Sequence, residues 1–470
     1  MNEPAAPAER LLFLTGHLAE PRLQRVLKGL GATNFEWQVL DIGVKVAALM
    51  TEAIIRRRIP RPVQADRVVL PGRFRGDIDK LSQELDVPVA RGPDEIIDLP
   101  AYLGRGGVAP DLSRHDIRLF AEIVDASGLS IDAILEKARA LVAAGADVID
   151  LGCLPDTPFP HLEDSIRALK EAGYLVSVDS ADTEELARGN RAGADFLLSL
   201  NAATLDVAKE GDAVPILIPS RPGDLDSLME AVDAAEARGL PFIADPVLDP
   251  IHFGFTASLL RYAEFRRLRP DAEILMGTGN LTELTDADSL GVTAALLGIC
   301  SELQIRNVLC VQVGPHTRRT LEEHDAARRL MFAAREDGSL PKGYGKMLLA
   351  LHDTRPFPTK PAEVAELARK VRDTNFRIEV CEDGIHIYNR DGHHVAGDAL
   401  SLFPKLGVEA DGAHAFYLGT ELMKAEVAFR LGKRYAQDEP LDWGVAADRP
   451  AVDETRLAEA GHTLRARKGS

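Results

Sequence analysis

A repeated unit of strand, loop and helix dominates the sequence from Ile117 onward. Short apolar runs alternate with segments whose apolar residues recur at three- and four-residue spacing, most clearly in Ile131–Val142. Eight such units in about 200 residues predict an α/β fold whose centre is a closed (β/α)8 TIM-type barrel over residues 113–335. An open doubly wound sheet is the alternative, but no dinucleotide fingerprint supports it. The predicted strands are Arg118–Val124, Val148–Leu151, Leu175–Val178, Phe196–Leu200, Pro215–Ile218, Phe242–Ala244, Glu273–Met276 and Asn307–Val311.

The pattern changes on both sides of this repeat. Residues 1–110 predict a small α/β domain that is either structural or binds a ligand at the strand end Thr15–His17. The following glycine-rich segment predicts a linker. Residues 336–374 predict a helical and linker segment, 375–445 a small C-terminal α+β domain, and 446–470 a polar, disordered tail. The predicted N-terminal strands are Leu11–Leu14, Trp37–Ile42, Arg67–Leu70 and Val87–Ala90, and the helices are Pro21–Leu30, Val44–Arg57 and Asp77–Leu85.

Composition excludes several classes of protein. Of 470 residues, 46% are hydrophobic and 27% are charged, which excludes a wholly disordered chain. The net charge of −18 disfavours nucleic acid as a partner. No apolar run approaches the roughly 20 residues of a membrane helix, and no secretion signal is visible. Four widely spaced cysteines without a C-x-x-C pair fit a reduced compartment, so we expect a cytoplasmic protein.

Polar residues follow the predicted barrel strands, where a TIM-type barrel carries its chemistry. A rim of carboxylates and amides suits a planar heterocycle with an amidine-like edge, because a carboxylate accepts two parallel N–H bonds. Pterin has such an edge. The candidates at the strand ends are Asp125, Asp179, Asn201, Arg221, Asp245, Asn280, His316 and Arg318.

Four segments of this barrel carry a family resemblance: AGADVIDLG, SVDS, FLLSLNA and IADPVLDP. They resemble the pterin-binding barrels, which comprise dihydropteroate synthase and the methyltetrahydrofolate-type methyltransferases. The resemblance implies that Asp179, Asn201 and Asp245 bind the pterin ring. It implies a Mg²⁺ ligand at Asp125, whose loop in the synthases helps to hold the magnesium diphosphate. Arg221, His316 and Arg318 are the corresponding candidates for contacts to the diphosphate.

The chain also departs from the synthases. They follow the seventh strand with a Ser-Arg-Lys stretch, whereas this chain has Gly277–Asn280 and no lysine. That turn resembles the methyltransferase branch, in which Asn280 would lie near N5 of the pterin. The synthases carry an Arg-x-His motif after the eighth strand. This chain has only His316, Arg318 and Arg319 there, at displaced positions. The N-terminal unit and the stretch His414–Asp438 resemble the dihydropteroate synthase-related proteins of microbes that use tetrahydromethanopterin.

Three hypotheses follow. The first is a transferase that joins a dihydropterin-methyl diphosphate to an arylamine in tetrahydromethanopterin-type biosynthesis. We expect this enzyme to be a homodimer, and Asp125 and Asn280 are its predicted catalytic residues. The second is methyl transfer from a methyl-pterin to a corrinoid protein, and the third is a pterin-binding subunit without chemistry. His393 and His394 do not predict a metal site, because neighbouring residues of a strand point to opposite faces and no cysteine or carboxylate cluster accompanies them at ligand spacing.

Overall fold

The computed structural model describes residues 8–17, 19–45, 47–93, 96–104, 111–338 and 340–448. These residues form two compact units. One unit combines the chain up to residue 104 with Leu351–Asp442, and the other combines residues 111–350 with Trp443–Asp448. The chain therefore passes from one unit to the other more than once.

The second unit is a parallel barrel of eight strands in the order β10-β9-β8-β7-β6-β5-β12-β11. A parallel bridge between Ala244 and Ile274 joins the two ends of this order, and the Ala244 N–H donates to the Glu273 carbonyl at 2.9 Å. The predicted (β/α)8 barrel is thus confirmed, and the open sheet is excluded because neither end strand remains an edge. The strands are β5 Arg118–Ile123, β6 Val148–Gly152, β7 Leu175–Asp179, β8 Phe196–Leu200, β9 Val214–Leu217, β10 Ile243–Ala244, β11 Leu275–Gly277 and β12 Asn307–Cys310.

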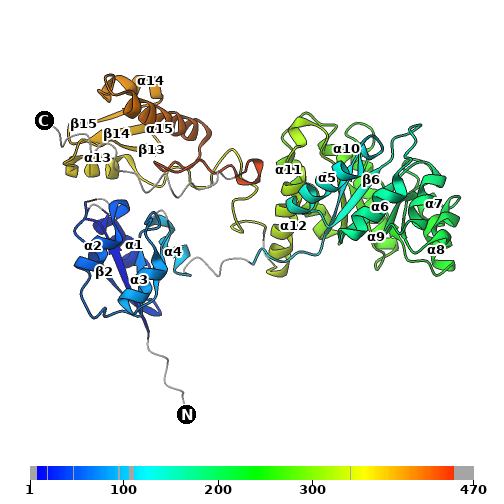
Figure 1. Cartoon of the computed structure of the whole chain (residues 1–470), viewed down its shortest axis with the longest axis horizontal. Coiled ribbons are helices and arrows are strands. Elements are labelled where there is room, and N and C mark those ends of the chain that lie inside the picture. Colours follow the sequence, from blue (N-terminus) through cyan, green and yellow to red (C-terminus); the bar gives the residue numbers. More distant parts are fainter. Residues whose placement is uncertain are drawn as a thin grey trace, which may run out of the picture. The chain divides into compact units, whose positions relative to one another are not determined.

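Helices surround these strands (Figure 1). Their apolar faces pack on the outside of the strands in one continuous core. Side-chain caps start several of them; Ser130, for example, accepts a hydrogen bond from the Ala133 N–H. The helices are α5 Ile131–Ala144, α6 Leu162–Glu171, α7 Thr183–Arg191, α8 Leu225–Ala237, α9 Phe255–Leu268, α10 Gly279–Thr282, α11 Ser289–Glu302 and α12 Thr320–Glu336.

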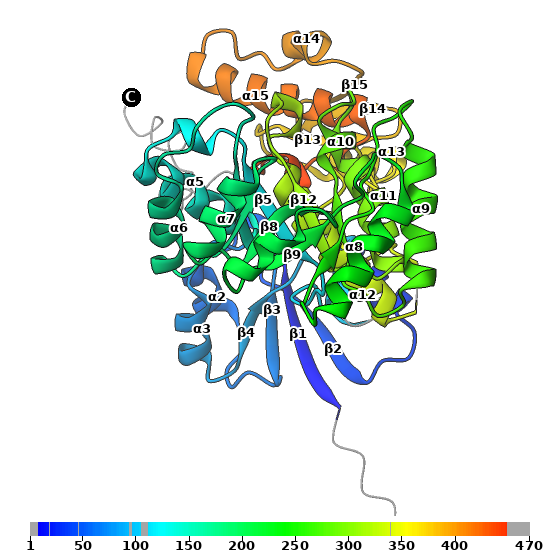
Figure 2. The same ribbon diagram turned by 90° about the vertical axis from the view of Figure 1, so that its right-hand side faces the viewer.

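The first unit contains a four-stranded parallel sheet in the order β2-β1-β3-β4, and Figure 2 shows these strands side by side. The predicted helix Val44–Arg57 is wrong in part, because a short 3-10 turn (Ala47–Leu49) precedes a helix capped by Thr51. At the strand ends, His17 Nδ1 lies 3.2 Å from Asp41 Oδ2. The elements are β1 Glu9–Thr15, α1 Glu20–Gly29, β2 Phe35–Asp41, α2 Glu52–Arg58, β3 Arg67–Leu70, α3 Ile78–Leu85, β4 Val89–Arg91 and α4 Leu99–Tyr102.

The C-terminal part of this unit is an antiparallel sheet between two helices (Figure 1). One sheet face packs on α15 and the other on α13. Ion pairs such as Arg75–Glu439, at 2.6 Å, join this part to the N-terminal part. The elements are α13 Pro361–Lys370, β13 Arg377–Cys381, β14 Gly384–Asn389, β15 Gly392–Ala396, α14 Ala399–Leu402 and α15 Gly412–Leu431.

The last described residues belong to the barrel unit, which moves the predicted C-terminal boundary at 445. The Val445 N–H donates to the Met347 carbonyl, and Arg319 donates to the Val445 carbonyl at 3.0 Å. Most of the predicted tail, 449–470, lies outside the described residues. In the described part of the chain, no helix is both long and apolar enough to cross a bilayer.

The base of the barrel depends on one buried cation. Arg328, whose side chain is 2% exposed, pairs with Asp147 and Asp325 and donates to the Ile117 carbonyl at 2.6 Å. Replacement by methionine removes the cation from the half-buried Asp147 and the donors from the Ile117 and Gly145 carbonyls, whereas Asp325 keeps its ion pair with Arg329. We expect Arg328→Met to lower the free energy of unfolding of the barrel unit by about 3–5 kcal/mol in chemical denaturation. Arg267→Met, at an exposed ion pair with Glu264, is the control and should change nothing measurable; equal effects would contradict the assignment.

Candidate active site

The register of the first three barrel strands places polar side chains beside one another. Glu122 of β5 pairs with Asp150 of β6, which pairs with Ser177 of β7. Side chains two residues apart on a strand share a face, so Glu122 and Asp150 point to the side on which Phe120 and Val148 fill the barrel interior. The polar groups therefore form the layer above this apolar plug, toward the carboxyl ends of the strands.

Three carboxylates meet in this layer. One oxygen from each of Glu122, Asp150 and Asp179 lies within 4.8 Å of the others. Asp150 is fully buried; its Oδ1 accepts a hydrogen bond from the Ser177 hydroxyl, but its Oδ2 has no hydrogen-bond partner among the described residues. Gly152 provides the space, since a Cβ there would lie 2.5 Å from Glu122 Oε1. We refer to these three residues as the carboxylate cluster.

Burial changes the acidity of the cluster. Desolvation and the nearby charges of Asp179 and Glu122 raise the pKa of Asp150 well above its usual range. Desolvation, with Glu122 and Asp245 as further causes, raises the pKa of Asp179 to about 7. Burial also raises the pKa of Glu122. The cluster is thus stabilised either by bound protons or by a cation.

Asp245 follows β10 and is fixed at one oxygen. Its Oδ1 accepts hydrogen bonds from the Tyr262 hydroxyl at 2.6 Å and from the Val247 N–H at 2.8 Å. Desolvation raises the pKa of Asp245 to about 6, although both bonds and the charge of Arg261 act in the opposite direction. Within the described chain no hydrogen bond reaches Oδ2, so this oxygen keeps its lone pairs for a ligand.

The loop after β10 is held from two sides. Arg261, which is 9% exposed, donates to the Pro246 carbonyl at 2.7 Å and to Asp249 at 2.8 Å. Asn280 Nδ2, from the short helix α10, donates to the Leu248 carbonyl at 2.8 Å. Val247 has φ +68°, which is unfavourable for a β-branched residue. These contacts maintain a strained loop beside Asp245, as is common at functional sites.

Asn201 ends β8 in a tight turn. Its Oδ1 accepts a hydrogen bond from the Ala203 N–H at 2.9 Å. Since that bond fixes the amide plane, the Nδ2 group is the part of the side chain with donors for a ligand.

The other predicted residues are exposed or contact partners outside this cluster. Asp125 pairs with Lys137 at 2.9 Å, its side chain is 60% exposed, and the Lys137 ammonium lowers its pKa. Arg221 is 80% exposed and pairs with Asp224 of its own loop. His316 Nε2 lies 3.2 Å from the Thr282 carbonyl oxygen, and Arg318 is exposed.

Sequence reasoning missed Glu122 and Tyr262 and did not select Asp150. The available signal was an acidic residue within an otherwise apolar run, as in LFAEIV and VIDLG, because a buried strand admits a charge only for a reason. Tyr262 lies on the next helix, α9, 17 residues after its partner Asp245, and no sequence pattern marks it.

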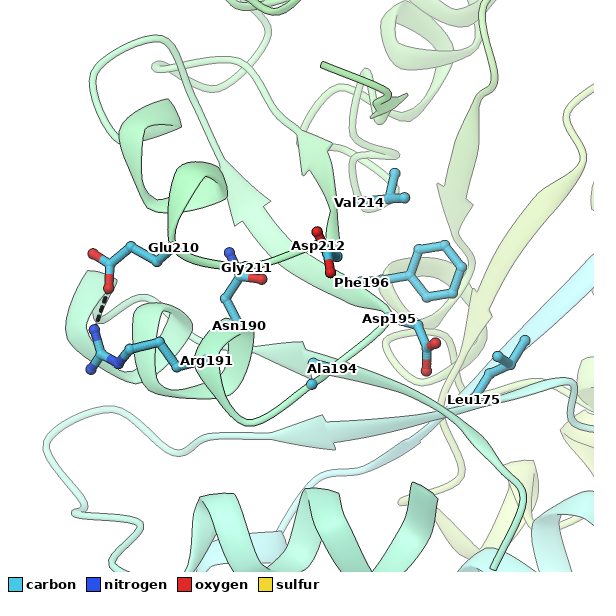
Figure 3. Close-up of a pocket in the computed structure, with 11 residues that line it drawn as sticks. Leu175, Asn190, Arg191, Ala194, Asp195, Phe196, Glu210, Gly211, Asp212 and Val214 are labelled. Carbon is cyan, nitrogen blue, oxygen red and sulfur yellow. Dashed lines mark hydrogen bonds and ion pairs between the residues drawn. The ribbon is translucent and has the colours of Figure 1, made fainter. Parts of the chain in front are cut away.

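A separate cavity of about 520 Å³ lies at the opposite end of the strands (Figure 3). It is lined by the starts of β7, β8 and β9, including Leu175, Phe196 and Val214, and an Arg191–Glu210 ion pair crosses its margin. That end of a barrel serves stability, so we place the site at the carboxylate cluster and Asp245 instead.

The fold and these residues define a (β/α)8 barrel with an acidic, amide-containing strand-end site.

Residues 9–94 match the model of a family of unknown function, DUF6513. The chain is 25% identical to an uncharacterized protein of Methanocaldococcus jannaschii, over 91% of this chain and 98% of that one. Similar solved structures include the 7,8-dihydropteroate synthase of Vibrio fischeri (18% identity, TM-score 0.39, 48% of this chain and 94% of that one). Another is the dihydropteroate synthase of Thermus thermophilus in complex with 4-aminobenzoate (21% identity, TM-score 0.35, 47% and 95%).

The raised pKa of Asp179 predicts a pH-dependent cost of its charge. The folded-state pKa of about 7 exceeds the unfolded value of 3.8, so the protein loses stability as pH rises from about 4 to 7. Asp179→Asn removes this titration. In metal-free protein we expect a thermal midpoint higher by on the order of 5 °C at pH 8, and much less change at pH 4. Asp271→Asn, at an exposed loop, is the control; a pH-independent difference for Asp179→Asn would contradict the prediction.

Proposed function

We propose that the barrel binds a pterin at its strand ends and joins a dihydropterin-methyl diphosphate to an arylamine. The observation that carries this proposal is Asp245, whose Oδ1 is held by Tyr262 and Val247 while Oδ2 remains an acceptor for the N–H edge of the ring. Asp179 interacts electrostatically with Asp245. Asn201 contributes amide donors from the next strand end, and the quoted sequence motifs support the same assignment.

The reaction would form a C–N bond, break a C–O bond and release a proton from the amine. The arylamine nitrogen attacks the methylene carbon of the pterin, the C–O bond to the diphosphate breaks, and the nitrogen loses its proton to solvent. The chain would contribute mainly orientation: the pterin edge fixed by Asp245 and Asn201 presents the methylene carbon to the amine. In tetrahydromethanopterin-type biosynthesis the arylamine would be a ribofuranosyl-aminobenzene phosphate.

The residues present fit a magnesium ion. The carboxylate cluster offers oxygen ligands, which Mg²⁺ prefers, and the buried Asp150 Oδ2 has no hydrogen-bond partner among the described residues. Asp125 is 60% exposed and already paired with Lys137, so we assign Mg²⁺ to Glu122, Asp150 and Asp179 instead. A bound Mg²⁺ supplies positive charge for a diphosphate.

The direct test is incubation of the purified full-length chain with Mg²⁺, the pterin diphosphate and either arylamine. Pyrophosphate should be released together with the coupled product. No release with 4-aminobenzoate or with the ribofuranosyl-aminobenzene phosphate, under conditions in which a known synthase is active, would exclude this reaction.

Methyl transfer from a methyl-pterin to a corrinoid protein is the second candidate. The observation that favours it is Asn280, which lies on α10, contacts the loop after Asp245, and stands where the synthases carry their lysine stretch. A hydrogen bond from such a residue to N5 would make the pterin amine a better leaving group. Methylation of a reduced corrinoid, followed by its absorption spectrum, would support this candidate. Unchanged methyl-pterin with a competent corrinoid protein would exclude it, and tight pterin binding without either reaction would indicate a binding subunit.

Substitution of Asp245 tests the pterin site itself. In Asp245→Asn the retained oxygen can still accept from Tyr262 and Val247, while an N–H₂ group replaces Oδ2 and opposes the ring donors. An unpaired buried polar group costs about 1–3 kcal/mol, so affinity for 6-hydroxymethylpterin should fall about 10- to 100-fold in calorimetry. Thermal unfolding should show a folded variant, and Asp271→Asn is again the control. Wild-type affinity in a folded Asp245→Asn protein would remove the main support for a pterin site.

The same carboxyl predicts the pH dependence of binding. Asp245 must be ionised to accept ring donors, and the pKa of its carboxyl in the free protein is about 6. Affinity should be constant above pH 7 and fall about tenfold for each pH unit below 6, because the competent fraction falls by that factor. Calorimetric titrations between pH 5 and 8 measure this dependence, and a flat profile would contradict it.

A further inference from the structure

A second group of chemically reactive side chains lies on the C-terminal sheet, outside the barrel. The hairpin β13–β14 turns through Glu382 and Asp383, with Cys381 paired to Gly384 and Glu379 paired to His386. Residues two apart on a strand share a face, so Cys381, Glu379 and His386 lie on the sheet face that packs against α13. Tyr388 pairs with His393 of β15 on that same face.

Three of these side chains converge. Cys381 Sγ, a carboxylate oxygen of Asp383 and a ring nitrogen of His386 lie within 4.8 Å of one another. His386 Nε2 is 2.7 Å from Asp383 Oδ1. Cys381 and His386 are buried, whereas the Asp383 side chain is 47% exposed. The group therefore combines sulfur, nitrogen and oxygen atoms and reaches solvent at Asp383.

His386 is oriented from its other ring nitrogen. His386 Nδ1 lies 2.9 Å from His393 Nε2, and the two rings are stacked with centroids 5.2 Å apart. When Nδ1–H donates to His393, the Nε2 lone pair faces Asp383 and Cys381. Histidine ligands of metals are commonly fixed in this way by a partner at the second nitrogen.

The surroundings favour a cation. Glu379, Glu382 and Asp383, three acidic residues of the hairpin, lie within two positions of Cys381 along the chain. The 2.7 Å between His386 Nε2 and Asp383 Oδ1 is a hydrogen-bond distance, so in the metal-free protein Nε2–H donates to this carboxylate. A divalent metal would replace this proton, which moves to Nδ1, and would offset the charges of the thiolate and the carboxylate.

We propose that Cys381, Asp383 and His386 bind one Zn²⁺, with water in the fourth position and His393 as the positioning residue. Binding displaces the thiol proton of Cys381 to solvent, and the metal accepts the thiolate, the carboxylate oxygen and the neutral imidazole Nε2. A thiolate, an imidazole and a carboxylate suit zinc rather than magnesium or calcium, which prefer oxygen alone. The spacing Cys-x-Asp-x-x-His places all three ligands within one hairpin.

The sequence prediction that His393 and His394 are not metal ligands stays a prediction, because the three proposed ligands are other residues of the sheet. His393 acts only through its contact with His386. His394 pairs with Ile387, whose side chain belongs to the core under α15, so it lies on the opposite face of the sheet. His394 is therefore the matched control for His393.

The test uses the full-length chain, stripped of metal, with Co²⁺ as a spectroscopic probe. We expect one Co²⁺ per chain, a thiolate-to-cobalt charge-transfer band in the near ultraviolet, and displacement of the cobalt by one equivalent of Zn²⁺. Cys381→Ser should abolish the band. We expect His393→Gln to lower the affinity for Co²⁺ about 10- to 100-fold. Asp383→Asn changes only a half-exposed side chain and should lower this affinity at least as much.

The controls separate this site from other thiols and histidines. His394→Gln and Cys153→Ser should keep both the affinity and the band. Absence of stoichiometric Co²⁺ in the wild-type protein, or wild-type affinity in a folded Asp383→Asn variant, would overturn the proposal and leave an Asp383–His386–His393 hydrogen-bond chain. A band that survives in Cys381→Ser would also overturn it. None of these outcomes depends on pterin binding.

Discussion

The lateral alignment of parallel strands places Glu122 beside Asp150 and Asp150 beside Ser177, and the candidate site depends on this alignment. Taking carboxylates out of water is costly unless protons, hydrogen-bond donors or a cation compensate. The interior supplies few donors: Ser177 serves one oxygen of Asp150, and the other has none within the described structure. The buried carboxylates of this layer therefore still require protons, donors or a cation, which an apolar barrel interior would not.

Asp245 shows the opposite arrangement. Tyr262 and the Val247 backbone saturate one oxygen, and Arg261 holds the loop that carries it. A carboxylate fixed in this way loses little freedom when a ligand binds, so less of the interaction energy is spent on ordering. One part of the rim therefore has carboxylates that lack hydrogen-bond donors among the described residues, while the other holds its carboxylate in a fixed orientation.

Sequence reasoning could predict what is local and periodic. Eight apolar runs with helical spacing between them predict the barrel, and residues that end a strand or follow it, such as Asp179 and Asp245, can be placed at its rim. It could not predict Glu122 as a neighbour of Asp150, because that needs the pairing register. It missed the break before Thr51, which caps α2 within an apolar run, and the contact of His386 with Cys381 and Asp383. Each of these depends on backbone geometry or on residues that meet only after folding.

The route of the chain has a consequence for synthesis. The sheet β1–β4 shares a unit with Leu351–Asp442, and Arg75, Arg25 and Asp98 pair with Glu439, Glu363 and Arg434. A ribosome makes all eight barrel strands between these two halves, so the first-made segment is without its partners while more than half of the chain emerges. The barrel can complete its strand order before the N-terminal segment meets its counterpart. A nascent chain released before Glu439 would contain every barrel strand but lack the Arg75 ion pair.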